Sequence, residues 1–192
     1  RVEKCKTMDS KKVPLWLHFV NADPVGDEII VIFKNGDDLR QDQLTLQMLR
    51  IMERKWERAG LDMKLSPYLC VATGDEVGFI EVVLESNTTA NITKQYSSGA
   101  RGAFAKEPMA MYLQEHNKSS DHYRKAVETF LYSLAGYCVA TYVMGIGDRH
   151  NDNVMLSKHG RLFHIDFGHF LGNFKSKFGI KRETAPFVFT PD

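Results

Sequence analysis

Two short motifs near the end of the chain contain the residues best suited to chemistry: GIGDRHNDN, which ends at Asn153, and HIDFG, which has Asp166 at its centre. Transfer of a phosphoryl group needs carboxylate and amide oxygens that hold Mg²⁺, and a group that orients or deprotonates the attacking hydroxyl. Asn153 and Asp166 have oxygen atoms for the first task. Asp148 and His150 suit the second. These residue types therefore indicate metal-assisted phosphoryl transfer.

A predicted hairpin brings Asn153 and Asp166 together, although they are 13 residues apart. Its strands are expected at 154–156 and 162–165. We predict a two-residue turn at His159-Gly160, in which glycine supplies a positive φ. In that register Asn153 lies directly opposite Asp166, and residues paired in this way have Cβ atoms about 5 Å apart. The spacing therefore predicts a shared metal site at the mouth of the hairpin.

Simpler interpretations exist for the single residues of these motifs. Any one Asp or Asn could belong to an ordinary turn, but the combined spacing, hairpin and preceding helix favour the metal site. His164 could be a structural histidine of the strand or a catalytic one. The sequence also leaves open whether Asp148 or His150 accepts the proton.

The clearest helix is expected between Asp37 and Gly60. Its apolar stripe consists of residues at helical spacing, and Gly60 is well placed to end the helix. The stripe residues are Leu44, Met48, Ile51 and Met52, widened by Leu49 and Trp56. Strands are expected at about 14–20, 29–34, 69–72 and 78–84, and helices at 108–116 and 123–144.

The order of these elements predicts an α+β chain with a strand-rich first part and a helix-rich second part. The composition turns polar and small from Glu85 to Gly102, which indicates a change of lobe. Accordingly we expect one lobe at 1–84 and a second at 85–192. A junction of this kind is a frequent place for an active site.

Bulk properties exclude several classes of protein. A net charge of +1 with 26% charged residues gives no sign of nucleic-acid binding. The three cysteines match no metal-ligand spacing, which favours a reduced, intracellular chain. Residues 130–147 carry no charge and are barely long enough to span a membrane, but they are too polar to do so, and a helix buried in a core is expected. The chain lacks an initial methionine and is expected to be a fragment.

The two motifs resemble the catalytic loop and metal-binding motif of the phosphoinositide 3-kinase superfamily. Ordinary protein kinases have the triplet as His-Arg-Asp, the reverse of residues 148–150. The resemblance runs from about residue 8 to 190 and is closest to the kinase domain of class I catalytic subunits. It implies a bilobal protein-kinase-like fold with an incomplete C-lobe, and ATP and Mg²⁺ as cofactors. By position, Asn153 and Asp166 would hold magnesium, and the catalytic residues would be Asp148, His150 and Lys34.

The chain has no glycine-rich phosphate loop, so other residues would have to hold the phosphates of ATP. The same resemblance implies which residues form the nucleotide pocket. Ser10 and Lys12 would approach the phosphates from a turn that could otherwise be plain solvated surface. Lys34 ends an apolar strand, a place where lysine is rare unless it is paired. The carbonyl of Glu81 and the amide of Val83 would bind adenine. The full set is Met8, Ser10, Lys12, Trp16, Lys34, Asp42, Tyr68, Ile80, Glu81, Val83, Met155 and Ile165, whose apolar members could equally be core.

A basic segment after the HIDFG motif indicates the phosphate acceptor. It has four cations in eight residues: Lys175, Lys177, Lys181 and Arg182. A charge run is usually a solvated face, but here it resembles the class I substrate loop. That resemblance implies transfer to the 3-hydroxyl of phosphatidylinositol 4,5-bisphosphate. Thr184-Ala185 departs from the Arg-Val usual in class I, and Leu69 stands where glycine is common.

Two alternatives to this lipid kinase remain: a serine/threonine protein kinase of the related large-kinase family, and a nucleotide-binding scaffold without activity. The resemblance also implies partners and a location in receptor-coupled signalling. These are a regulatory adaptor subunit and a Ras-type GTPase, bound through domains absent here, and a cytoplasmic protein recruited peripherally to the inner face of the plasma membrane.

Overall fold

A computed structural model describes residues 1–97, 107–170, 176–177 and 180–181, the last two pairs as backbone. The chain forms two compact units. The first consists of Arg1–Met48 and Tyr68–Val83, and the second of Leu49–Pro67 and Leu84–Asp192. Helices and strands occur together, as expected for an α+β chain.

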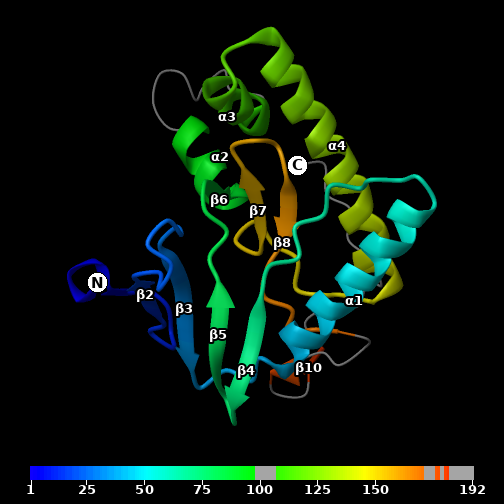
Figure 1. Cartoon of the computed structure of the whole chain (residues 1–192). Coiled ribbons are helices and arrows are strands. Elements are labelled where there is room, and N and C mark those ends of the chain that lie inside the picture. Colours follow the sequence, from blue (N-terminus) through cyan, green and yellow to red (C-terminus); the bar gives the residue numbers. More distant parts are fainter. Residues whose placement is uncertain (98–106, 171–175, 178–179, 182–192) are drawn as a thin grey trace. The chain divides into compact units, whose positions relative to one another are not determined.

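The first unit is built on a five-stranded antiparallel sheet with the order β1-β2-β3-β5-β4 (Figure 1). Its strands are β1 Lys6–Thr7, β2 Leu15–Phe19, β3 Ile29–Asn35, β4 Cys70–Gly74 and β5 Val77–Glu81, and the 3₁₀ helix Val2–Lys4 precedes them. The predicted strands at 14–20 and 29–34 are confirmed within one residue. The next two are confirmed with shifted ends.

The register of this sheet places three predicted nucleotide residues on one face. Trp16 pairs with Ile32, and Ile32 pairs with Ile80 on the other side. Directly paired residues share a face, and so do residues two apart along a strand. Lys34 therefore lies on the same face as Trp16 and Ile80.

Helix α1, Arg40–Arg58, confirms the predicted helix but buries only part of the predicted stripe. The Asp38 carboxylate accepts a hydrogen bond from the Arg40 N–H at its start. Leu44, Met48 and Ile51 are exposed, so the predicted stripe is wrong at these positions, whereas its member Leu49 is buried. The buried positions are Asp42, Thr45, Leu46 and Leu49, which also follow helical spacing. Two of these are polar, and for this reason the hydrophobic pattern did not reveal the face.

The end of α1 confirms the role of Gly60. The residue has a φ of 80°. Its N–H binds the carbonyl of Glu57, and the N–H of Leu61 binds that of Trp56. This pair of bonds is the Schellman ending, which needs a left-handed residue.

The second unit combines a three-stranded sheet, β6-β7-β8, with helices α2, α3 and α4 and with the part of α1 that follows Met48 (Figure 1). Its elements are β6 Ser86–Thr88, α2 Thr89–Ser97, α3 Pro108–His116, α4 Ser120–Val143, β7 Val154–Ser157 and β8 Leu162–His164, with a short pair β9 Ser176–Lys177 and β10 Ile180–Lys181. The bounds of α3 are as predicted. The segment from Glu85, expected as a polar connector, instead contains β6 and α2.

Helix α4 is buried on one face only, so the expectation of a fully buried helix was too broad. Gly136, Tyr137 and Ala140 lie inside, whereas Leu131 and Tyr142 are 58% and 65% exposed. Ser133 and Thr141 are buried too, because each hydroxyl donates to a carbonyl four residues earlier in the helix. No helix among the described residues is long and apolar enough to cross a membrane.

The hairpin of β7 and β8 forms as predicted, but its register differs by one residue. Val154 pairs with His164, and Leu156 with Leu162. The loop has three residues because Ser157 and Arg161 close it, and only the last of the three, Gly160, has a positive φ, of 89°. A two-residue type I′ turn requires positive φ at both central positions, which His159 does not adopt. Asn153 therefore faces Ile165, and Asp166 lies one residue beyond the predicted pairing.

Gly160 should be more sensitive to an added side chain than Gly60, because its left-handed turn also lies against α4. A Cβ there would be 2.0 Å from the backbone oxygen of Ala126, whereas a Cβ at Gly60 would meet nothing within 4 Å. Gly60→Ala should cost about 1 kcal/mol of unfolding free energy from backbone strain alone. Gly160→Ala should cost about 2 kcal/mol more, since the hairpin must move from the helix.

Urea unfolding of both variants measures this difference. Hydrogen exchange should also speed up in β7 and β8 of the Gly160 variant alone. Equal losses of stability would show that the contact with α4 is loose.

Candidate active site

The loop after α4 brings together two predicted catalytic residues, Asp148 and His150, and one predicted metal ligand, Asn153. Asn153 is buried, and its side-chain nitrogen lies 2.9 Å from the carbonyl oxygen of Asp148 and 3.0 Å from Nε2 of His150. The Asn153 N–H also binds the carbonyl of His150, at 2.8 Å. Because the amide nitrogen is used inside the loop, the amide oxygen is the atom suited to a cation.

Arg149 joins this loop to the HIDFG motif. Its Nε donates to the carbonyl of Gly147, at 2.9 Å, and its Nη1 to that of Ile165, at 2.8 Å. Its Nη2 donates to the carbonyl of Asp166. The guanidinium also lies over the ring of Phe167, 5.6 Å from the centroid. One side chain thus holds the backbone on both sides of the predicted site.

His169 makes a second connection between the two segments. Its carbonyl accepts a hydrogen bond from the Gly147 N–H, at 3.2 Å. Its Nε2 is 3.8 Å from the Asp148 carboxylate, and the ring is almost fully buried. The sequence prediction included neither His169 nor a tethering role for Arg149. The position of His169 directly after the HIDFG motif is the signal that could have suggested it.

Two predicted acids have an unusual backbone. Asp148 and Asp166 both have a φ of 57°, in the left-handed region that non-glycine residues seldom adopt. Such conformations persist only where surrounding contacts hold them, and they are common at functional sites. The bonds from Asn153 and Arg149 to the carbonyls of these two residues are contacts of that kind.

The residues present fit a hard cation. Asp166 is exposed and directly follows Ile165, whose N–H binds the carbonyl of Asn153 at 3.0 Å. The Asp166 carboxylate is of the ligand type that Mg²⁺ prefers. No group of three or more His, Cys, Asp or Glu side chains suited to a metal occurs among the described residues.

His164, which the sequence left open, has the surroundings of a structural residue. Protein atoms enclose its ring on most sides, although a small fraction stays exposed. It stacks on Tyr137, with 5.1 Å between ring centroids. Burial, and to a lesser extent the Arg149 guanidinium, lowers the pKa of His164 to about 3. The ring is therefore neutral at physiological pH, and within the described residues its Nδ1 has no hydrogen-bond partner.

In the first unit, two predicted phosphate-binding cations lie near the end of β3. Lys34 is largely buried and pairs with Asp37, at 3.2 Å. The ammonium group of Lys12 lies against Gly36, since a Cβ on that glycine would be 3.2 Å from Nζ. The loop that carries Lys12 is closed by a bond from the Met8 N–H to the Pro14 carbonyl, at 2.8 Å.

Two hydrogen bonds to Leu69 fix the end of the predicted adenine-binding strand. Glu81 ends β5, and its carboxylate accepts a hydrogen bond from the Leu69 N–H at 2.6 Å. The Glu81 N–H binds the Leu69 carbonyl in return, at 2.8 Å. The adenine contacts of Glu81 and Val83 remain predictions, as does the nucleotide role of Tyr68 and Asp42, both of which are buried.

Two predicted nucleotide residues and the predicted substrate residues belong to the second unit. Met155 lies in β7 opposite Phe163, and Ile165 follows β8. The backbone of Lys177 and Lys181 lies in β9 and β10, where Lys177 pairs with Ile180 and Lys181 with Ser176. Lys175 and Arg182 lie outside the described residues.

The chain is similar in sequence to known lipid kinases. Residues 28–192 match the family described as phosphatidylinositol 3- and 4-kinase. Phosphatidylinositol 3-kinase 1 of Dictyostelium discoideum is 65% identical over 191 residues, which is 100% of this chain and 12% of the relative. Phosphatidylinositol 4-phosphate 3-kinase C2 domain-containing subunit beta of Homo sapiens is 53% identical over 188 residues, 98% of this chain and 11% of the relative. The chain thus spans about a tenth of the length of these relatives.

Removal of the Arg149 side chain should loosen the HIDFG segment. Arg149→Ala loses three hydrogen bonds to carbonyls, each worth about 0.5–1.5 kcal/mol, so amide exchange at residues 165–170 should rise by roughly 10-fold or more. Arg124→Ala is a matched control, because Arg124 is exposed and pairs with the neighbouring helix residue Asp121. Hydrogen–deuterium exchange that is equal in the two variants would contradict the tethering role.

His164 should make the protein less stable in acid. A group with a pKa of about 3 when folded and about 6.5 when unfolded binds fewer protons in the folded state between those values. The contribution of His164 to the free energy of unfolding is therefore complete above about pH 6.5. It falls as the pH falls, and about 2 kcal/mol is lost at pH 5.

Urea unfolding at pH 7 and pH 5, without divalent cations, tests this. His164→Phe keeps an aromatic ring on Tyr137 and should remove that part of the loss, whereas a change of the exposed His159 to Gln should not. A His164→Phe protein with wild-type pH dependence would contradict the assignment.

Proposed function

Because the chain belongs to the phosphatidylinositol 3- and 4-kinase family, we propose that it contains the catalytic residues of a lipid kinase acting on the 3-hydroxyl of phosphoinositides. The main support is the tethered pair of motifs in the second unit. Arg149 binds the backbone of the HIDFG segment, while Asn153 binds the loop that carries Asp148 and His150. Phosphoryl transfer depends mainly on such positioning and on charge stabilisation.

Each residue of this set has a defined task in the proposal. The amide oxygen of Asn153 and the carboxylate of Asp166 hold Mg²⁺, which would neutralise charge on the transferred phosphate. Asp148 and His150 orient the attacking hydroxyl and receive its proton. The 3.8 Å approach of the buried His169 to the Asp148 carboxylate supports a fixed orientation of that acid.

The first unit supplies the residues that bind ATP. Lys34 and Lys12, near one end of β3, neutralise phosphate oxygens as point charges. Trp16 and Ile80 share a sheet face with Lys34 and contact the adenine ring, with Glu81 and Val83 as its backbone partners. Ser10 joins Lys12 in the phosphate-binding turn.

The acceptor in this proposal is phosphatidylinositol 4,5-bisphosphate. Four cations between residues 175 and 182 supply the charge that a headgroup with two added phosphates requires. The name of the human relative refers to phosphatidylinositol 4-phosphate, which makes that lipid the second candidate. An adaptor subunit, a Ras-type GTPase and peripheral binding to the plasma membrane would involve parts of the protein beyond this chain.

Phosphate transfer from ATP by the purified full-length protein tests the proposal. Vesicles contain phosphatidylinositol, its 4-phosphate or its 4,5-bisphosphate, and an Asp166→Asn variant is the blank. The blank should lose at least about 100-fold in rate, because a group that stabilises transition-state charge is removed.

A second variant neutralises Lys175, Lys177, Lys181 and Arg182. This variant should lose activity on the 4,5-bisphosphate and keep activity on phosphatidylinositol. If the 4-phosphate is the preferred lipid, the acceptor assignment changes. If only protein is phosphorylated, the chain belongs to a protein kinase instead, and binding of ATP without any transfer would indicate a scaffold.

A further inference from the structure

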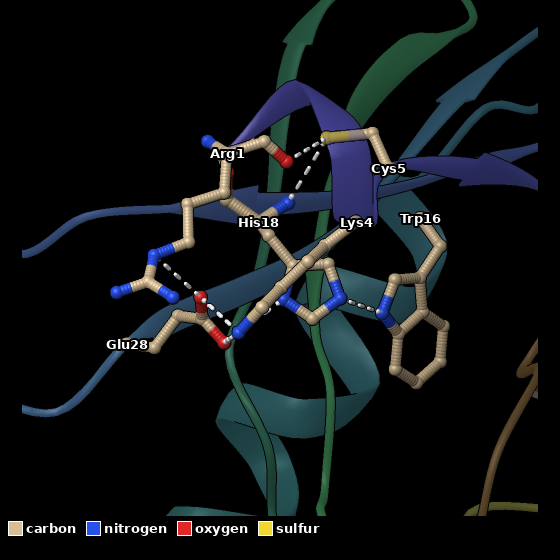
Figure 2. Close-up of polar contacts among 6 residues, drawn as sticks. All are labelled: Arg1, Lys4, Cys5, Trp16, His18 and Glu28. Atoms are coloured by element: carbon tan, nitrogen blue, oxygen red, sulfur yellow. Dashed lines mark hydrogen bonds and ion pairs between the residues drawn. The ribbon is translucent and has the colours of Figure 1, made fainter.

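A line of polar contacts in the first unit ends on the indole of Trp16. Trp16 Nε1 lies 2.9 Å from Nε2 of His18, and Nδ1 of His18 lies 3.0 Å from the carboxylate of Glu28 (Figure 2). Trp16 and His18 are two residues apart on β2, so their side chains lie on the same face of the sheet. The imidazole of His18 therefore holds the indole at its N–H edge, and the carboxylate of Glu28 holds that imidazole.

These contacts define where the proton of His18 lies. An indole N–H can only donate, so Nε2 of His18 must accept. A neutral imidazole has one N–H, which then lies on Nδ1 and donates to Glu28. Glu28 thus selects the one tautomer that can receive the hydrogen bond of Trp16.

Glu28 is kept ionised by the residues at the start of the chain. Lys4 lies 3.0 Å and Arg1 3.3 Å from its carboxylate. The hydrogen bond from Lys4, followed by that from His18, lowers the pKa of Glu28. The same segment holds the backbone of His18, whose N–H binds the sulfur of Cys5 at 3.4 Å (Figure 2). The carbonyl of His18 accepts a hydrogen bond from the backbone nitrogen of Arg1 at 2.9 Å.

A further contact restrains the ring of Trp16. Lys6 is its direct partner on β1, and the ammonium group lies 5.2 Å from the ring centroid. Such cation–π contacts favour one orientation of the ring. The indole is thus restrained at one edge and on one face, while Ile32 pairs with it on β3.

We propose that His18 and Glu28 are positioning residues that fix the orientation of Trp16 for binding of the adenine ring. This inference rests on the proposed function, in which Trp16 contacts the nucleotide. His18 and Glu28 act through Trp16, so they change the affinity for ATP and leave the rate of phosphoryl transfer almost unchanged. A merely structural role would instead lower stability and leave the affinity of the folded protein as it is.

Two substitutions of His18 separate its two contacts. His18→Gln places an amide near the position of Nε2 and keeps an acceptor for the indole. His18→Asn is shorter, reaches only the region of Nδ1, and loses that acceptor. In the full-length protein, the Asn variant should raise the KM for ATP by about 5- to 10-fold, the effect of one lost hydrogen bond, with kcat within about twofold of wild type. The Gln variant should restore the KM to within about twofold.

The Trp16→Phe background is the matched control. If His18 acts through the indole, His18→Asn should have no further effect on KM there, as a double-mutant cycle requires. An equal effect in both backgrounds would overturn the proposal, and so would equal KM values in the Asn and Gln variants. Thermal unfolding of each variant identifies any loss of ATP affinity that comes from reduced stability alone.

A measurement without substrate separates this inference from the proposed function. With 5-fluorotryptophan incorporated, the Trp16 resonance is the one that Trp16→Phe removes. Its ¹⁹F shift should move in His18→Asn and stay near the wild-type value in His18→Gln. An unmoved resonance in the Asn variant overturns the positioning role. A moved resonance in a protein that transfers no phosphate supports the fixed indole, and the failure then lies in the proposed function.

Discussion

The arrangement of the candidate site depends above all on the guanidinium of Arg149. It donates hydrogen bonds to the carbonyls of Gly147, Ile165 and Asp166, and these residues belong to two segments separated by the β7–β8 hairpin. A guanidinium has five N–H donors in a rigid plane, so it can hold several carbonyls at once in one geometry. A lysine at this position would hold the same carbonyls less rigidly. The contact of Arg149 with the buried ring of Phe167 adds a packed surface to this connection.

This tether accounts for the unusual backbone of the predicted acids. Asp148 and Asp166 are left-handed, a conformation that costs about 1–3 kcal/mol and needs support from the surrounding structure. Asn153 and Arg149 provide this support through the backbone carbonyls of these residues, so the Asp166 carboxylate itself remains suited to a metal ion. The separation is useful because a carboxylate used to hold the loop could not also coordinate Mg²⁺ fully.

The first unit achieves positioning by a different device, the register of its sheet. Trp16, Ile80 and Lys34 come from three strands and share a face because the strands pair without a shift in this region. Side chains in a sheet stand at a fixed spacing, but a large ring can still rotate about its own bonds. The contact with His18 and the ammonium group of Lys6 restrict that rotation. Backbone pairing thus determines the sheet face on which these side chains lie, and side-chain contacts determine the orientation of the Trp16 ring.

The sequence by itself determined the two motifs, the positions of most helices and strands, and the roles of Gly60 and Gly160, because these depend on local residue types and on backbone preferences. Tertiary structure alone decided the hairpin register, since only one residue of the turn became left-handed, and with it the partner of Asn153. The buried face of α1 was also decided there, because its polar Asp42 and Thr45 pack inside where a hydrophobic pattern cannot reveal them. The roles of Arg149, His169 and His18 likewise come from contacts between residues distant in sequence or from ring geometry, which residue spacing does not encode.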